Sequence, residues 1–349
     1  MRTSQTPGRA DSLLCLKGHA ITAVHRCRRT GLCDVSFRHS PAVDWRQVIT
    51  AVIDQHGGLA TRRELLQRVP ATVIDGYVGR RTLVRVFPHV YRAAGRSLDD
   101  GMLLRAALRH TGPVAALSHT TALSVWGLAP LGRPIHVTVD QSVRRAGAAD
   151  LTVHRRLRFV PAAPQCVRRR GLLVTDLPRS MIDSWPLLEP QHRRPLLLDV
   201  CRRRLTTSDR LRGALAERPN VGGHRMLAQA IDLVEDGCES EFEALGVLNV
   251  FRHRSLPRSV GQYRVVLPTG GIRLDRALPE VKLAVELDGA RHHTSPEDRR
   301  RDLARDTALA ALGWVVLRFT YADVLRDPDL VRRRVLAAYA TRRAQLRVG

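Results

Sequence analysis

The stretch EVKLAVELDGARHH, residues 280–293, combines a strand-like apolar pattern with two carboxylates. Side chains along a β-strand point alternately to opposite faces of the sheet. One face of this segment therefore receives only apolar residues, while the other receives Glu286 and Asp288 together. A strand that is otherwise suited to burial thus projects two acidic groups from a single face.

The segment before it, GGIRLDRALP (residues 270–279), adds a third carboxylate, Asp275. If the two strands form an antiparallel hairpin through Pro279 and Glu280, Asp275 lies within about two positions of Glu286. Carboxylates so close repel one another unless protons or a cation neutralise them. Oxygen ligands favour a hard divalent ion. The pattern therefore predicts a site for Mg²⁺ or Mn²⁺.

The neighbouring elements predict a mixed α/β sheet for residues 238–349. Glu239–Val250 reads as an amphipathic helix, with Phe242, Leu245 and Leu248 on one face, and a second helix starts near Ser295 and ends at Gly313. A strand, a helix and a further strand in this order require a right-handed crossover. The strands expected are QYRVVL (262–267), 270–279, 281–289 and the apolar, fully buried WVVLRFT (314–320).

Three motifs in this part of the chain carry a family resemblance. SEFEALG, RLDRALPEVKLAVELDGARHH and RRRDLARDTALAALGWVVLRFT occur in this order between residues 238 and 340. Together they resemble the domain of unknown function DUF559, a branch of the PD-(D/E)XK nuclease superfamily that is similar to the very-short-patch repair endonucleases. The resemblance implies a restriction-endonuclease-like α/β/α fold.

The resemblance also implies roles for individual residues. Glu243, Asp275 and Glu286 are implied as metal-site carboxylates, and Glu286, Asp288 and His293 as catalytic residues. Asp288 stands where the superfamily usually has a lysine. His293 as a base, or a metal-bound hydroxide, would then take over part of the role of that lysine. Lys282 is a weaker substitute, because it lies at the opposite end of the strand.

Ordinary structural roles remain open for several of these residues. Glu243 competes with Glu239 and Glu241 for the place on the helix, and His293 also reads as part of a polar strand end. Residues three apart on a helix favour surface ion pairs. Glu286 and Asp288 could form ordinary ion pairs with Arg273 or Lys282 instead of acting in catalysis. Asp302 and Arg305 could likewise form an ion pair with each other.

The segment 45–96 predicts a winged helix-turn-helix. WRQVITAVIDQHGG (45–58) has helical spacing, Thr61 and Glu64 form a capping box, and a third helix starts after Pro70. TLVRVFPHVYRAA (82–94) follows as a β-wing. The segment resembles the winged-helix domain of AbiEi-type antitoxins, which implies DNA binding through the third helix and nearby arginines. The DNA contacts expected are Thr61, Arg62, Arg63, Thr72 and Arg80.

Residues 97–237 predict an α+β domain with a helical extension, which resembles the domain that follows the winged helix in the AbiEi family. LSHTTALSVWGL and VTDLPRSMIDSW carry that resemblance. Ser118 reads as a helix cap rather than a nucleophile, since adjacent helical residues diverge and no acid partner is evident. Residues 1–44 lack periodicity and predict a disordered leader.

Composition narrows the class of protein. The chain has 349 residues and a formal charge of +24, which favours a polyanionic partner. Lys17 and Lys282 are its lysines, so the excess of arginine also fits a GC-rich gene. Six scattered cysteines, together with the absence of a signal sequence and of an apolar span, predict a reduced, cytoplasmic setting without a membrane segment.

These features together predict a multidomain α/β and α+β protein that hydrolyses DNA phosphodiesters with Mg²⁺ or Mn²⁺ and is targeted by an N-terminal winged helix. The alternative function is that of a non-catalytic, antitoxin-type DNA-binding regulator with a degenerate nuclease fold. An RNA substrate also remains open. A homodimer is plausible, because cutting both strands of a duplex requires two sites.

Overall fold

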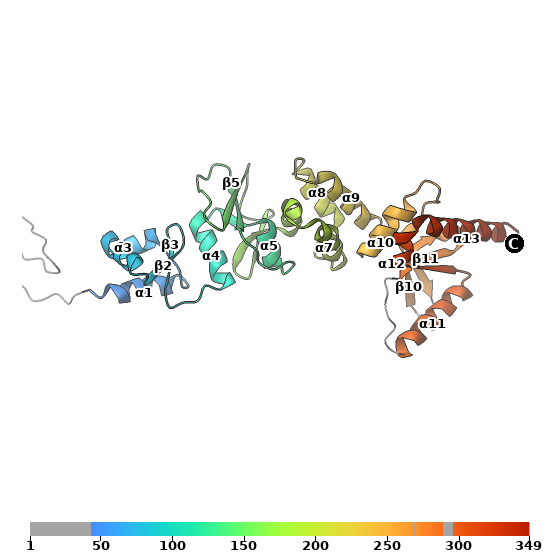
Figure 1. The fold of residues 1–349 in the computed structure, drawn as a ribbon, viewed down its shortest axis with the longest axis horizontal. Helices are drawn as coiled ribbons and strands as arrows, with labels where there is room; N and C mark the ends of the chain where they lie inside the picture. The colour runs from blue at the N-terminus through green and yellow to red at the C-terminus, as the bar shows by residue number, and fades with distance from the viewer. Residues whose placement is uncertain (1–42, 268–269, 289–295, 349) are drawn as a thin grey trace, which may run out of the picture. The chain divides into compact units, whose positions relative to one another are not determined.

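The computed structural model describes residues 43–267, 270–288 and 296–348, and within these ranges the protein is a mixed α/β structure. The described residues form three β-sheets, of three, five and four strands, which follow one another along the chain (Figure 1). Each sheet, with the helices around it, is described in turn. In the described ranges, every helix is too short or too polar to cross a membrane.

The first sheet has the strand order β1-β3-β2 and is accompanied by three short helices. Thr61 caps the second helix, because its side chain accepts a hydrogen bond from the Glu64 amide while the Glu64 carboxylate accepts one from the Thr61 amide. This is the capping box that the sequence predicts. The elements are α1 (Trp45–Gln55), β1 (Ala60–Thr61), α2 (Arg62–Leu66), α3 (Ala71–Gly79), β2 (Leu83–Phe87) and β3 (Val90–Ala93).

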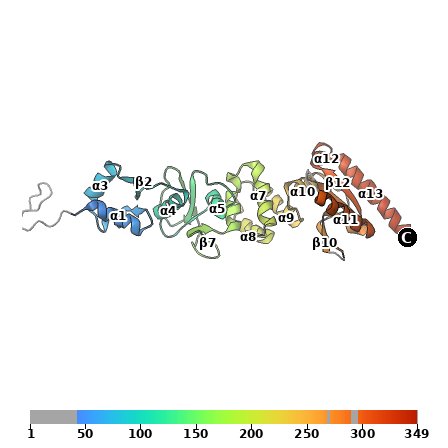
Figure 2. The same ribbon diagram turned by 90° about the horizontal axis from the view of Figure 1, so that it is seen from below.

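The second sheet is mixed, with the strand order β6-β5-β4-β8-β7. Helices α4 and α5 pack on its strands (Figure 2). Their apolar residues share one core with Leu59, Phe87 and Val90 of the preceding segment. The elements are α4 (Asp100–Thr111), β4 (Ala115–Leu117), α5 (His119–Trp126), β5 (Ile135–Asp140), β6 (Leu151–Arg156), β7 (Cys166–Arg169) and β8 (Leu172–Thr175).

A helical segment follows and builds its own core around Trp185, Leu197 and Leu211. Its first helix packs on α5, and its later helices pack on one another. The elements are α6 (Leu177–Ser184), the short helix η1 (Trp185–Leu187), α7 (Pro190–Arg202), α8 (Ser208–Ala216) and α9 (His224–Glu235).

The third sheet has the order β12-β11-β10-β9 and is also mixed. Strand β10 is antiparallel to both β9 and β11, whereas β11 and β12 are parallel and are connected through α11. The elements are α10 (Glu241–Gly246), η2 (Val247–Phe251), β9 (Val260–Leu267), β10 (Gly270–Leu278), η3 (Pro279–Val281), β11 (Leu283–Asp288), α11 (Pro296–Ala311), β12 (Val315–Thr320), α12 (Tyr321–Arg326) and α13 (Pro328–Val348).

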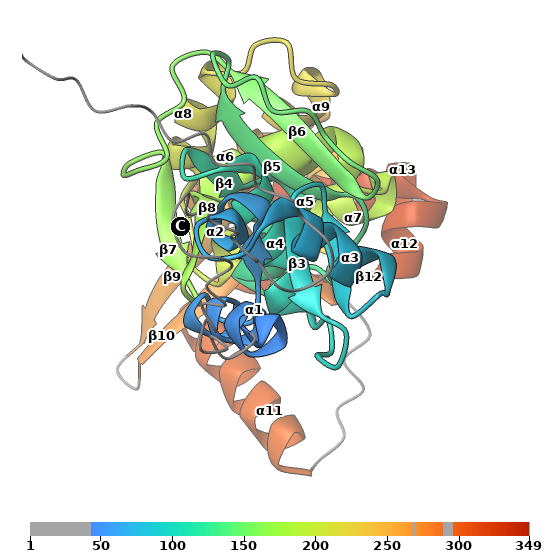
Figure 3. The same ribbon diagram turned by 90° about the vertical axis from the view of Figure 1, so that its left-hand side faces the viewer.

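Helices α11 and α13 cover opposite faces of this sheet (Figures 1 and 3). Leu283, Val285 and Leu287 of β11 pack in the core that includes α13, whereas Ala284 packs in the core beneath Leu309 of α11. The alternation expected from the sequence therefore holds in β11, and Glu286 follows Ala284 on the α11 face.

The helix α10 approaches β11 closely because residue 246 is a glycine. A Cβ atom at Gly246 would lie 2.5 Å from the Cδ1 atom of Leu287. The chain then changes to a π-helix, η2, so the expected continuous amphipathic helix is wrong in detail. Leu245 and Leu248 are only half-buried, whereas Val247 and Val250 are buried, because the wider π turn rotates the buried face.

Two further expectations about this sheet need correction. Lys282 is not part of the central strand, since the turn η3 precedes it and its backbone is left-handed, with φ 48°. Strand β12 is not fully buried: Phe319 is, but most of its other residues are half-buried or exposed. The reason is that β12 is an edge strand, which lacks a neighbour on one side.

Candidate active site

The register of β10 and β11 brings two of the expected carboxylates together. Ala277 pairs directly with Ala284, and Arg276 with Val285. Both alanines lie in the core beneath α11. Asp275 and Glu286, each two residues further along its strand, therefore share that face of the sheet. This is the juxtaposition that the sequence predicts.

Asp275 is partly buried and surrounded by negative charge. Its Oδ2 atom accepts a hydrogen bond of 3.0 Å from the Leu287 amide. Burial, together with the charges of Glu243 and Glu286, raises the pKa of Asp275 to about 6, while the Leu287 amide and Arg305 oppose the rise. An acid with such a pKa exchanges its proton near neutral pH, as groups at catalytic sites often do.

Glu243 is held at the start of α10 by three donors. The Ser240 hydroxyl donates to Oε1 at 2.8 Å, and the Glu239 amide and the Gln262 side chain donate to Oε2 at 3.0 and 2.7 Å. The backbone of Gln262 is left-handed, with φ 50°. A left-handed residue other than glycine is uncommon, and strained residues of this kind cluster at functional sites.

The two rival glutamates of α10 have other partners. Both Nη atoms of Arg273 donate to Glu239, at 2.7 and 2.6 Å. Arg194 pairs with Glu241. Among these three glutamates, Glu243 is the one whose charge acts on Asp275. The structure therefore brings Glu243, Asp275 and Glu286 into one acidic cluster.

Glu286 is 7% exposed and is held by two arginines. Arg305 of α11 donates from Nη2 to Oε1 at 2.5 Å and from Nη1 to Oε2 at 3.1 Å. Arg318 of β12 donates from Nε to Oε2 at 3.3 Å and also pairs with Asp306. Arg305, which the sequence suggested for an ion pair with Asp302, thus reaches into the site and binds Glu286.

The remaining catalytic expectations lie at the boundary of the described residues. Asp288 ends β11 in register with Thr320, but its side chain is outside the described part. His293 lies wholly outside the described residues. Lys282 faces elsewhere: its ammonium group donates to the Leu312 carbonyl at 3.1 Å, near the C-terminal end of α11.

The acidic cluster fits a hard divalent ion in the chemistry of its donors but not in their present pairing. Asp275 and Glu286 offer the carboxylate oxygens that Mg²⁺ prefers. However, no three His, Cys, Asp or Glu side chains among the described residues are arranged to hold a metal ion. Arg305 contacts both oxygens of Glu286. A bound ion and the Arg305 pair therefore compete for the same carboxylate.

Of the DNA-contact residues expected near the N-terminus, some have partners within the protein and others are exposed. The Thr61 side chain serves as the cap of α2, and Arg62 forms a two-bond ion pair with Asp75, at 2.7 and 3.1 Å. Arg63 and Thr72 are exposed. Arg80 is also exposed and lies over the Tyr77 ring at 4.9 Å from its centroid.

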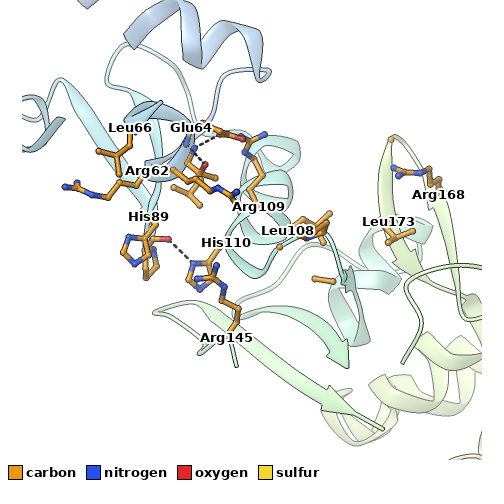
Figure 4. A pocket seen from close by; sticks show the side chains of 18 residues that line it. Arg62, Glu64, Leu66, His89, Leu108, Arg109, His110, Arg145, Arg168 and Leu173 are labelled. Carbon is orange, nitrogen blue, oxygen red and sulfur yellow. Dashed lines mark hydrogen bonds and ion pairs between the residues drawn. The ribbon is translucent and has the colours of Figure 1, made fainter. Parts of the chain in front are cut away.

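A pocket of about 810 Å³ opens where α2 meets the middle sheet, and most of its charged residues are arginines. Figure 4 shows Arg62 and Arg109 at one end, Arg145 in the middle and Arg168 at the other end. Glu64, the one acidic residue of its lining, already pairs with Arg109. His110 is anchored by its contact of 2.9 Å with the Pro88 carbonyl. The pocket therefore has a strongly positive lining.

Sequence reasoning missed Arg318 and Gln262 as members of the site, and it missed the contact of Arg305 with Glu286. Arg318 stands directly beside Glu286 in the parallel pairing of β11 and β12. An arginine within an apolar strand was the available signal for this residue. Gln262 carried no comparable signal, because its side chain reaches Glu243 only through a left-handed backbone.

Comparison with known proteins supports the class of the C-terminal part. Residues 261–339 match the model of REase_MTES_1575, a restriction-endonuclease-like family. The match covers β9 to α13 and so includes Asp275, Glu286, Arg305 and Arg318. This part of the chain is therefore restriction-endonuclease-like.

Other relatives are similar over very different lengths of the chain. An uncharacterized protein of Mycobacterium tuberculosis, Rv2248 in strain H37Rv and MT2308 in strain CDC 1551, is 26% identical over 269 residues, which are 75% of this chain and 94% of the relative. An uncharacterized protein of Haemophilus influenzae is 38% identical over 52 residues, 15% of this chain and 42% of the relative. The crystal structure of the RV2827C protein of M. tuberculosis aligns with a TM-score of 0.42 and 15% identity, over 64% of this chain and 89% of that one.

Proposed function

We propose that the protein is a metal-dependent endonuclease that hydrolyses DNA phosphodiesters at the acidic cluster of β10, β11 and α10. The observation that carries this proposal is that the register of β10 and β11 places Asp275 and Glu286 on one face of a sheet whose sequence matches a restriction-endonuclease-like family. Asp275, Glu286 and Glu243 would hold Mg²⁺ or Mn²⁺. Such an ion, when bound, polarises the phosphate and lowers the pKa of a water molecule.

Arg305 supplies the positive charge that the superfamily lysine usually brings. A guanidinium group cannot act as a base at neutral pH, but it stabilises charge on phosphoryl oxygens. In the described arrangement this guanidinium rests on Glu286. A substrate phosphate attracts Arg305 away from Glu286 and so frees the carboxylate. Asp288 and His293 are assigned to orienting and deprotonating the water, since they follow Glu286 directly in the sequence.

The N-terminal segment 45–96 is proposed to bind the duplex as a winged helix, with Arg63, Thr72 and Arg80 as contacts because their side chains are exposed. Arg62 would join them on leaving Asp75, whereas Thr61 is already used as a cap. The arginine-lined pocket extends this positive surface into segment 97–237. Cleavage of both strands requires two copies of the nuclease segment 238–349, so we propose that cleavage occurs in a dimer.

The proposal predicts that purified protein nicks supercoiled plasmid in Mg²⁺ or Mn²⁺ and that Glu286→Gln does not. The reason is that this substitution removes the charge while keeping the side-chain size. Glu280→Gln is the matched control, since Glu280 is exposed on the neighbouring turn η3. Gel electrophoresis measures the nicked fraction, with EDTA as a second control and a labelled RNA duplex as a test of substrate class.

Equal nicking by the Glu286→Gln variant would refute the assigned site. A second function is favoured by one observation, namely that two arginines hold Glu286 in an arrangement without a ready metal site. In that case the protein is a DNA-binding regulator. Plasmid binding without nicking under every metal condition would support the regulator and overturn the enzyme.

A further inference from the structure

A second buried polar cluster lies outside the acidic site, where strands β5 and β6 meet α5, α6 and the end of α8. It contains charged and titratable side chains that the proposed nuclease mechanism does not use. We call it the histidine–arginine cluster. Its members are His119, His136, His154, Arg156, Arg179, Asp183, Glu217 and Arg218.

The three histidines form the uncharged side of this cluster. The His119 and His154 rings stack with their centroids 3.7 Å apart, and His136 Nδ1 lies 3.0 Å from His154 Nε2. Burial, followed by the neighbouring charges, lowers the pKa of His119 to about 2 and that of His154 to about 4. The backbone of His119 is left-handed, with φ 52°, and the Ser118 hydroxyl contacts its Nδ1 atom instead of capping α5.

Three arginines form the charged side around the carboxylates of Asp183, Glu217 and Asp176. Arg179 and Asp183 lie deep, with side chains 7% and 4% exposed, whereas Arg218 and Glu217 lie at the rim, 40% and 58% exposed. Asp183 Oδ1 is 3.0 Å from Arg218 Nε, and Oδ2 is 3.7 Å from Arg156 Nη1. Burial raises the pKa of Asp183 despite these arginines. Asp176 Oδ1 also lies 3.8 Å from Arg179 Nε, so the three arginines face three carboxylates, of which Glu217 is the most exposed.

Several buried polar atoms of this cluster lie near carboxylates without forming a well-aligned hydrogen bond. Among the described residues, hydrogen bonds are missing for Arg156 Nη1, Arg179 Nε and Nη1, Arg218 Nε and Asp183 Oδ1. Arg218 Nε and Arg156 Nη1 are 3.0 and 3.7 Å from Asp183 oxygens, and Arg179 Nε is 3.8 Å from Asp176 Oδ1. Buried N–H groups are nearly always paired, because an unpaired one loses its bonds to water without compensation. Buried arginine donors that are poorly aligned with their carboxylates, Arg179 Nη1 among them, can accept better-placed oxygens from outside the chain.

Glu217 shows where those oxygens would lie. A single atom, Oε2, accepts from Arg156 Nη2 at 3.1 Å and from Arg179 Nη2 at 2.5 Å. Glu217 is the most exposed member of the two pairs and can leave without opening the core. A phosphate group presents three or four oxygens where this carboxylate presents one, and planar arginine forks match phosphate geometry.

We propose that the histidine–arginine cluster binds a phosphate dianion, either free phosphate or the terminal phosphate of a small phosphomonoester, in the place of the Glu217 carboxylate. The phosphate oxygens accept hydrogen bonds from Arg156, Arg179 and Arg218. The buried Asp183 carboxylate orients Arg156 and Arg218. The depth of Arg179 favours a compact terminal phosphate over the flanked phosphodiester of a nucleic-acid chain. The site is separate from the nuclease cluster and does not rest on the proposed function.

The test is isothermal titration calorimetry of the full chain with inorganic phosphate in chloride buffer. We expect binding of one phosphate that is weakened about tenfold or more in Arg218→Gln, because a charged hydrogen-bonding partner is lost. We expect Glu217→Gln to bind about tenfold more tightly, because the competing internal charge is removed while the side-chain shape is kept. Arg212→Gln is the control, since Arg212 on α8 pairs with Asp232 and Glu235 instead.

Arg218→Gln should weaken phosphate binding and Glu217→Gln should strengthen it. These opposite effects on affinity distinguish a binding site from a purely structural ion network. Repetition with a nucleoside monophosphate identifies the source of the phosphate: tighter binding than inorganic phosphate indicates a nucleotide, and equal binding indicates the free ion. The proposal is overturned if neither the wild type nor Glu217→Gln binds phosphate, or if the affinity is the same in Glu217→Gln, Arg212→Gln and the wild type. Circular dichroism checks that each variant is folded. If Arg218→Gln does not fold, the phosphate affinity of Glu217→Gln alone decides the test.

Discussion

Asp275 is a partly buried acid with negative neighbours, and its ionisation opposes folding. Its pKa rises from the ordinary value of 3.8 to about 6, first through burial and then through Glu243 and Glu286. Between about pH 4 and pH 6, the folded protein therefore binds more protons than the unfolded chain. Linkage then requires that the contribution of Asp275 to the free energy of unfolding falls as pH rises through this window.

Asp275→Asn is expected to raise the free energy of unfolding at pH 7.5 by roughly 3 kcal/mol, because it removes a charge that costs about 1.4 kcal/mol per pKa unit. The asparagine carbonyl can still accept the bond from the Leu287 amide. Urea denaturation at pH 4 and at pH 7.5 measures the effect, which should nearly vanish at pH 4. Equal or lower stability of the variant at pH 7.5 would show that Asp275 is not under electrostatic stress, and Glu280→Gln is the control.

The position of Arg305 decides whether the Glu286 carboxylate is available to bind a cation. Its two bonds to the carboxylate compete with cation binding. Arg305→Gln is therefore expected to bind Mn²⁺ more tightly than the wild type, by roughly tenfold, because a charged partner of Glu286 is lost. Mn²⁺ binding is measured by electron paramagnetic resonance, and nicking by the same variant should decrease. Weaker Mn²⁺ binding would contradict the competition.

At the level of elements, β9 depends on a glycine at its start. A Cβ atom at Gly261 would lie 2.0 Å from the Asp236 carbonyl oxygen and 2.7 Å from Arg276 Nη1. Arg276 Nη1 donates to that same carbonyl at 3.0 Å. The close approach links β9 and β10 to the chain segment that precedes α10, and thereby helps to hold Glu243 near Asp275.

Gly261→Ala is expected to lower the free energy of unfolding by roughly 3 kcal/mol or more, because backbone must move to relieve the overlap. Gly213→Ala is the matched comparison. Gly213 lies inside α8, where a Cβ atom would meet nothing within 4 Å, so alanine should stabilise the protein by up to about 1 kcal/mol. Thermal melting of both variants measures the difference, and similar melting temperatures would contradict this account.

The elements of the C-terminal part were largely predictable, and the exceptions have local causes. The apolar alternation of β11 and the start of α11 follow directly from residue order. The late start of β11 after Lys282 and the π turn of η2 did not follow from it. Both depend on packing against neighbouring elements, as at Gly246 beneath Leu287, which overrides local periodicity.

At the level of the whole molecule, positive charge continues from the N-terminal helices to the middle sheet. Arg63, Arg145 and Arg168 line the pocket of Figure 4, are exposed, and have no carboxylate partner among the described residues. Because phosphate contacts release counterions, replacing any of these arginines by alanine should reduce the slope of log K against log salt for DNA binding by about one.

Fluorescence anisotropy of a labelled duplex over a series of salt concentrations measures this slope. Arg212→Ala should leave it unchanged, since Arg212 is already neutralised by Asp232 and Glu235. Identical slopes for the wild type and for all three pocket variants would show that DNA does not contact this surface. The winged-helix contacts Thr72 and Arg80 would then have to carry binding alone.

Residue order by itself determined the acidic strand, its preceding hairpin partner and the helix that connects two parallel strands, because strand and helix periods are local properties of the chain. Only the tertiary structure decided that Arg305 and Arg318 hold Glu286, that Gln262 holds Glu243, and that three histidines gather beside three arginines. These contacts join residues 18 or more positions apart, and their geometry depends on register, burial and unusual backbone angles that no local pattern encodes.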